Sequence, residues 1–254
     1  MPPNFRTLEG QIIGQSPIQA WLWECWQKMC EWKHGILGGD PHALVFNGDM
    51  IEGDHHKNMQ IISADVSDHV DAGIDLVKPH VKEATKTFFV KGTSCHVGNS
   101  EIIFGKALLE KGYSVEMNKE TNLPAWDKLF LDVAGVRCMF QHHITTTVRP
   151  WTEATGLAAQ LASETIEAVN NDEPVPRVIC CAHRHKFGQF SNGRQLAIVS
   201  PPWQMLTRYG HKVVGHARTK PGAYILDWRG VEDGSLPKVH EILFNAPHPK
   251  AITL

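Results

Sequence analysis

The chain has 254 residues, of which 42% are hydrophobic and 20% are charged, and its formal net charge is -2. This length fits one folded domain, and we expect a single domain over residues 1–254. The small net charge excludes a global field that would draw the protein to nucleic acid or to an acidic membrane, and no stretch approaches the roughly 18 apolar residues that span a bilayer.

The N-terminus lacks the basic, apolar and small-residue pattern of a signal peptide, so we expect a cytoplasmic protein with no membrane partner. Six cysteines occur, and none forms a C-x-x-C pair. We expect them to be buried apolar residues in a reducing compartment rather than disulfides or zinc ligands. Fifteen histidines are many for this length, and their placement is the main functional signal.

Residues 1–15 are expected to form a loop. Ser16-Pro17 is a typical helix start, and the apolar spacing predicts a helix that continues to His34 and stops at Gly35. We interpret its tryptophans as packing anchors, with a role in lining a substrate cleft as the alternative.

Four consecutive apolar residues follow, Ala43 to Phe46, and predict a fully buried strand. This strand ends at Asn47-Gly48-Asp49. Asn-Gly and Gly-Asp are common in plain turns. The carboxyl end of a buried strand is also where open α/β sheets bind their ligands, so Asp49 is a candidate site residue.

The rest of the chain alternates between predicted helices and strands, with no repeat and no linker. The expected helices cover residues 64–84, 101–111 and 152–170. The expected strands cover residues 86–91, 126–133, 136–141, 177–182, 188–190, 195–199, 224–228 and 239–244, and the second and third of these form a hairpin around Ala134-Gly135.

Four predicted strands end in Asp or His. Their ends are Gly48-Asp49, Gly92-Thr93-Ser94-Cys95-His96, His142-His143 and Ala182-His183-Arg184-His185. Strand ends at one edge of a sheet converge, and a carboxylate with several imidazoles suits zinc, manganese or iron. One histidine at a strand end is usually a structural cap, but four such ends together indicate a metal site.

These motifs, in this order, resemble those of the calcineurin-like metallophosphoesterases, and the branch found in phages and prophages most of all. The resemblance covers about residues 43–190. It implies a four-layer α/β/β/α sandwich and a bacterial or phage-infected cell. It also implies two divalent ions about 3.5–4 Å apart, with Mn²⁺ as the first expectation and Zn²⁺ or Fe²⁺ as alternatives.

The resemblance also assigns roles to the site residues. Asp49 would bridge the two ions, His142 and His183 would bind one ion, and His185 would bind the other. Thr93 would take a ligand position, with His143 as a neighbour that faces the substrate. His96 would face the scissile phosphate and steady or protonate the leaving oxygen. Arg184 would orient the substrate phosphate, with a surface salt bridge as the alternative. The implied reaction is attack of a metal-bound hydroxide on a phosphate mono- or diester, nucleic acid being one candidate substrate.

The chain departs from the family pattern in two places. Thr93 stands where the family has an asparagine ligand, so we expect that ion to be weakly held. The opening Asp-x-His and its first strand are absent. Asp40-Pro41-His42 begins the strand that Asp49 ends, so it lies at the wrong end. Asp54-His55-His56 is either a substitute ligand or a solvated loop.

We therefore expect that Met1 is an internal methionine of a longer product, a hypothesis that fails if the upstream coding DNA encodes no strand ending in Asp-x-His. This form would bind one ion well at most and hydrolyse slowly or not at all. The alternatives are a non-catalytic metal-binding or nucleic-acid-associated protein and a mononuclear zinc hydrolase that acts on amides with Glu52 as general base.

Overall fold

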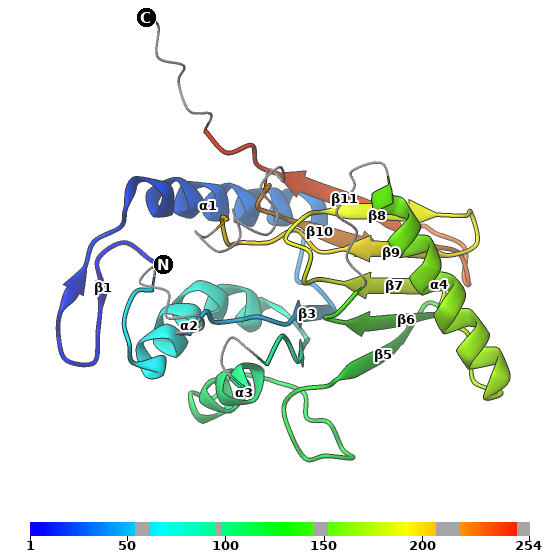
Figure 1. Ribbon diagram of the computed structural model, residues 1–254, viewed down its shortest axis with the longest axis horizontal. Coiled ribbons are helices and arrows are strands. Elements are labelled where there is room, and N and C mark those ends of the chain that lie inside the picture. The colour runs from blue at the N-terminus through cyan, green and yellow to red at the C-terminus, as the bar shows by residue number, and fades with distance from the viewer. Residues whose placement is uncertain (54–60, 95–97, 145–151, 207–218, 248–254) are drawn as a thin grey trace, which may run out of the picture.

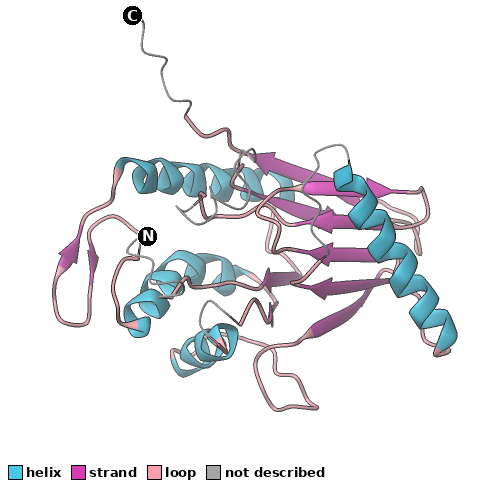
Figure 2. Cartoon of the chain, viewed as in Figure 1, coloured by secondary structure: helices cyan, strands magenta, loops and turns pink. Residues whose placement is uncertain are grey.

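The computed structural model describes residues 1–53, 61–94, 98–144, 152–206 and 219–247, and it is a mixed α/β fold (Figures 1 and 2). The described helices are α1 (Pro17–Leu37), α2 (Val66–Glu83), α3 (Ser100–Glu110) and α4 (Glu153–Asn170). The described strands are β1 (Phe5–Arg6), β2 (Ile12–Ile13), β3 (Ala43–Asn47), β4 (Lys86–Val90), β5 (Lys128–Val133), β6 (Val136–Gln141), β7 (Val178–Cys181), β8 (Gly188–Ser191), β9 (Leu196–Val199), β10 (Gly222–Asp227) and β11 (Lys238–Leu243).

The largest sheet has five strands in the order β5-β6-β7-β9-β8. Its inner pairs β6–β7 and β7–β9 are parallel, and its two outer pairs are antiparallel. The remaining strands form two-stranded sheets, namely parallel β3–β4 and antiparallel β1–β2 and β10–β11.

The inner strands of the five-stranded sheet are buried on both faces, and β7 shows how the sequence achieves this. Val178 and Cys180 pack with side chains from β3–β4 and β10–β11, whereas Ile179 and Cys181 pack with α4. Successive side chains of a strand point to opposite faces, so a run of four apolar residues is needed where both faces are covered. The same alternation holds for Cys138, Met139 and Phe140 in β6.

Helices α2 and α3 cover the other face of β3–β4. Phe89 and Phe104 are fully buried between them, and Phe46 stacks on Phe89 with ring centroids 5.1 Å apart. Helix α1 lies over β10 and β11 (Figure 1). None of the described helices combines the length and the apolar composition that a membrane span requires.

The prediction for β3 is right in position and wrong in burial. Ala43 is exposed and the other four residues are only half-buried, whereas four of the five residues of β4 are buried. Among the described strands, β3 pairs with β4 alone. A strand with one partner keeps part of its surface open, and hydrophobicity alone does not report the number of partners.

Two predictions at the N-terminal end of the chain are also wrong. Residues 1–15 are not all loop, because β1 and β2 form a short antiparallel pair. Helix α1 passes through Gly35 and ends at Leu37, and the φ of 61° at Gly38 gives the left-handed cap that glycine adopts without strain. Its start is as predicted, with Ser16 and Gln19 forming a capping box.

Cysteine burial agrees with the expectation from composition. Cys25, Cys138, Cys180 and Cys181 are buried, and Cys30 is half-buried. No disulfide joins these five, and Cys95 lies outside the described residues. Burial raises the pKa of the Cys180 thiol to about 12, so it stays protonated at neutral pH.

Candidate metal centre

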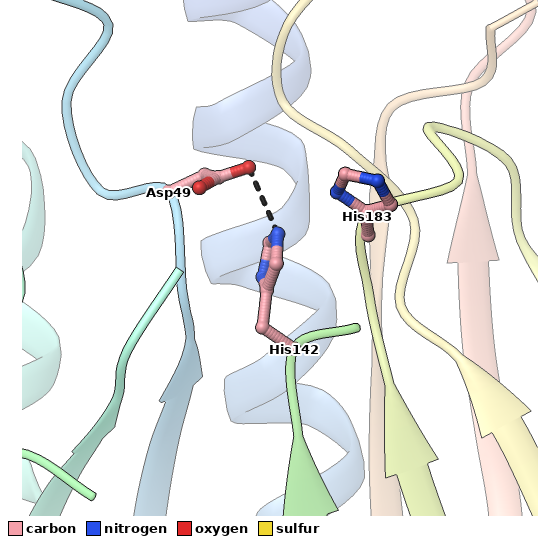
Figure 3. A group of neighbouring side chains, drawn as sticks. All are labelled: Asp49, His142 and His183. Carbon is pink, nitrogen blue, oxygen red and sulfur yellow. Dashed lines mark ion pairs between the residues drawn. The ribbon is translucent and has the colours of Figure 1, made fainter. Parts of the chain in front are cut away.

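Three of the predicted ligands meet at one point. Asp49 follows β3, His142 follows β6 and His183 lies just after β7, and one ligand atom of each lies within 4.8 Å of the others (Figure 3). The strands belong to two sheets, so the expectation of a single sheet edge is corrected. The site lies where the carboxyl ends of strands from both sheets come together.

The Asp49 carboxylate is held in a fixed direction. Its Oδ1 accepts a hydrogen bond of 2.6 Å from the backbone N–H of Thr93, and its Oδ2 lies 2.9 Å from Nε2 of His142. This arrangement needs two glycines. A Cβ on Gly48 would lie 2.3 Å from Nδ1 of His142, and a Cβ on Gly92 would lie 2.3 Å from Oδ1 of Asp49.

His142 presents its Nε2 to the site because its other ring nitrogen is already used. Nδ1 lies 2.7 Å from the carbonyl oxygen of Asn47, which can only accept, so Nδ1 carries the proton. In a neutral ring the Nε2 lone pair then faces a carboxylate oxygen at 2.9 Å. Two acceptors this close require a proton or a cation between them.

The electrostatics of His142 follow from this contact. Burial lowers the pKa of His142, but the hydrogen bond and charge of Asp49 outweigh burial, so the pKa is raised overall. At His183 burial lowers the pKa, and repulsion from His142 and His143 lowers it further. His183 is therefore the neutral imidazole of the group, which is the form that binds a metal.

The Thr93 hydroxyl lies between all three candidate ligands. Its Oγ1 is 3.1 Å from Nδ1 of His183, 3.3 Å from Nε2 of His142 and 3.4 Å from Oδ2 of Asp49. Tetrahedral ligands at bond lengths of about 2.0–2.1 Å lie about 3.3–3.4 Å apart. The three distances from Thr93 are close to this value, and the donor set of one carboxylate, two imidazoles and a hydroxyl suits a divalent ion in its chemistry.

The backbone is strained where the site residues sit. Asp49, His183 and His185 have φ values of 54°, 65° and 51°. Residues other than glycine rarely adopt this left-handed region of φ, and those that do are often found at functional sites.

His143, His185 and Arg184 lie around the three-residue group without joining it. The ring of His143 is exposed and meets the rings of His142 and His183 edge-on, at centroid distances of 5.2 and 4.8 Å. Burial, together with the charge of His142, lowers the pKa of His143. His185 and Arg184 are half-buried in the turn after β7.

Several predicted residues are not placed at the centre. His96 and Asp54-His55-His56 lie outside the described residues. Asp40-Pro41-His42 precedes β3, at the opposite end from Asp49, as expected. Glu52, the alternative general base, accepts a hydrogen bond from the side chain of Gln204.

Two residues of the site were not predicted. Asn47 orients His142 through its carbonyl and donates its side-chain Nδ2–H to the carbonyl of Cys180 at 3.1 Å. Glu101 is buried and receives hydrogen bonds from the backbone on both sides of the centre. In sequence Glu101 looks like an ordinary acidic residue in the first turn of a helix, and no local pattern distinguishes it.

Comparison with known proteins gives limited similarity. No family model and no curated protein matches the chain. An archaeal phosphodiesterase of known structure is 12% identical, with a TM-score of 0.44 over 87% of this chain and 93% of that one. Vps29 of Entamoeba histolytica in complex with Zn²⁺ is 14% identical, with a TM-score of 0.39 over 85% of this chain and 89% of that one. Identities this low do not transfer an activity or a metal.

Proposed function

We propose that this chain binds a divalent metal ion through Asp49, His142 and His183 and hydrolyses a phosphate mono- or diester. The observation that carries the proposal is the 2.9 Å approach of a carboxylate oxygen to an imidazole nitrogen whose lone pair faces it. Thr93 adds a hydroxyl whose distances to the three other donors are close to those in a tetrahedral site. Mn²⁺ is the first candidate, with Zn²⁺ or Fe²⁺ as alternatives.

When bound, such an ion neutralises phosphoryl oxygens and lowers the pKa of water from 15.7 toward about 7. The protein residues supply orientation. Asn47 fixes the His142 ring, and the Thr93 N–H fixes the Asp49 carboxylate. His143 is exposed beside the centre, which supports a role in contacting the substrate, and we assign the same role to Arg184.

Two further roles belong to the proposal. His96 would donate a proton to the leaving oxygen, and His185 would contribute to a second ion.

The experiment measures Mn²⁺ and Zn²⁺ binding by calorimetry and turnover of bis-p-nitrophenyl phosphate in the same preparations. Asp49→Asn keeps the shape and removes the charge, and His142→Gln removes the oriented nitrogen. Asp40→Asn and His42→Gln are matched controls, because both residues are exposed at the other end of β3. We expect both site variants to lose binding and turnover and both controls to keep them.

The outcomes separate the two classes of function. Metal binding with turnover that Asp49→Asn abolishes supports the phosphoesterase. Metal binding without turnover of any phosphate ester supports the non-catalytic alternative. Absence of metal binding by the unmodified chain refutes the phosphoesterase and leaves only a non-catalytic protein without metal.

A further inference from the structure

We infer that Glu101 is the positioning residue of the metal centre, a buried carboxylate that holds the two backbone turns carrying Asp49 and Thr93 at their working distance. The inference rests on the proposed metal site and goes beyond it, because Glu101 is not one of the candidate ligands and its described hydrogen bonds run to Met50, Gly92 and Ser100. Only 3% of its surface is exposed.

The hydrogen bonds of Glu101 reach both turns. Its Oε1 accepts from the backbone N–H of Met50 at 3.2 Å and from the Ser100 hydroxyl at 2.8 Å. Its Oε2 accepts from the backbone N–H of Gly92 at 3.1 Å. Met50 directly follows Asp49, and Gly92 directly precedes Thr93. One side chain therefore joins the turn after β3 to the turn after β4.

Joining these turns matters because the distance between them sets the distance between the candidate ligands Asp49 and Thr93. Thr93 also donates directly to Asp49 across the two turns, but Thr93 is itself a candidate ligand. Asp49 is held at a φ of 54°, in the left-handed region, which persists only where its surroundings enforce it. Glu101 supplies that enforcement from behind the site.

Burial and charge make the role specific to a carboxylate. Both oxygens are used, and both partners on the turns are donors. A glutamine would place its NH₂ against one of these N–H groups, so one turn would be released. Glu101 also lies in the first turn of α3, where the helix dipole favours a negative charge.

The test compares Glu101→Gln and Glu101→Leu with the unmodified chain, and uses Glu110→Gln as the matched control at the exposed far end of the same helix. Mn²⁺ affinity is measured by calorimetry well below the melting temperature of the metal-free protein. The visible absorption of the Co²⁺-loaded protein reports ligand geometry. Outer-shell substitutions typically weaken metal binding roughly 10–100-fold.

We expect Glu101→Gln to bind Mn²⁺ roughly 10–100-fold more weakly and to alter the Co²⁺ spectrum, with a larger loss for Glu101→Leu and no change for Glu110→Gln. A folded Glu101→Gln protein with unchanged affinity and spectrum overturns the inference, even if its melting temperature falls. If the unmodified chain binds no metal, the proposed function fails first.

A second measurement needs no variant. In the unmodified protein, the backbone amides of Met50 and Gly92 lie in turns, yet they donate to a buried carboxylate. We expect both amides to exchange with deuterium far more slowly than the exposed turn amide of Gly193, which donates only to an exposed hydroxyl. Exchange at the same rate overturns the inference.

Discussion

His142 is the residue on which the candidate site depends most. Its Nδ1 donates a hydrogen bond to the carbonyl oxygen of Asn47, and this bond orients the ring so that Nε2 faces Asp49. A sequence shows that His142 follows a strand, but not which ring nitrogen is used. The carbonyl group that determines this belongs to Asn47, which lies 95 residues earlier in the chain.

Proton competition at His142 predicts the pH dependence of metal binding. The pKa of His142 is raised above its ordinary 6.5 by Asp49, so protons compete with the ion at higher pH than usual. We expect Mn²⁺ affinity to be flat above that raised pKa and to fall about tenfold per pH unit below it. Calorimetry from pH 5.5 to 8.5, in buffers of different ionisation enthalpy, would also count the proton released.

In the metal-free protein, the contribution of His142 to folding stability changes with pH in the opposite direction to the metal affinity. A histidine whose folded pKa is raised stabilises the fold fully below 6.5 and loses that contribution as the pH rises through the raised pKa. The pKa values of His143 and His183 are lowered in the folded protein, so these two residues make the fold less stable as the pH falls below 6.5. An affinity for Mn²⁺ that rises toward acid pH contradicts this account.

At the scale of elements, close packing of the turns after β3 and β4 predicts a glycine requirement. Gly92→Ala would place a Cβ 2.3 Å from the backbone nitrogen of Asp49, so we expect a loss of about 1–3 kcal/mol in the free energy of unfolding and weaker metal binding. Gly39→Ala is the control, since nothing lies within 4 Å of its Cβ. Urea unfolding in the presence of a chelator measures the stability of the two variants, and calorimetry measures their metal binding.

The first turn of α1 predicts a smaller effect. Ser16 accepts from the backbone N–H of Gln19, whose side chain accepts from the N–H of Ser16. We expect Ser16→Ala to cost about 1 kcal/mol of stability and to leave metal binding unchanged, because the helix start is far from the site in sequence and in contacts. Gln27→Ala, at an exposed position inside the same helix, should cost little.

Elements with strong local signals were predicted well. The Ala134-Gly135 turn has both residues at positive φ, as a two-residue hairpin requires, and β5 and β6 flank it as the predicted antiparallel pair, with Val133 opposite Val136. The end of α1 was missed, because a glycine in mid-helix and a glycine in the cap look alike in sequence. The pair β1–β2 was missed because two-residue strands carry no periodic pattern.

At the scale of the whole molecule, the sequence did not reveal how the strands divide into sheets. The apolar runs predict buried strands equally for β3 and β7, yet β7 lies between two partners and β3 has one described partner. Pairing depends on contacts between residues far apart in sequence, and no local pattern encodes them. The convergence of Asp49 with His142 and His183 was predictable as a set, but not as a junction of two sheets.

That junction predicts that metal stabilises the entire fold. The ligands come from both sheets, so an ion would bind the folded chain and not the unfolded one. At a free concentration 100 times Kd, we expect about 2.7 kcal/mol of added stability. Differential scanning calorimetry with Mn²⁺ and with chelator measures the shift. Asp49→Asn should lose this shift, Asp40→Asn should keep it, and an equal shift in both would mean that the ion binds elsewhere.

The hydrogen bond from Asn47 to the carbonyl of Cys180 ties the end of β3 to the end of β7. A shear of one layer over the other by a single residue, about 3.3 Å, would separate the ligands completely. Loss of the bound ion would therefore be a sensitive measure of any displacement of β3 relative to β7, even one that leaves the helices intact.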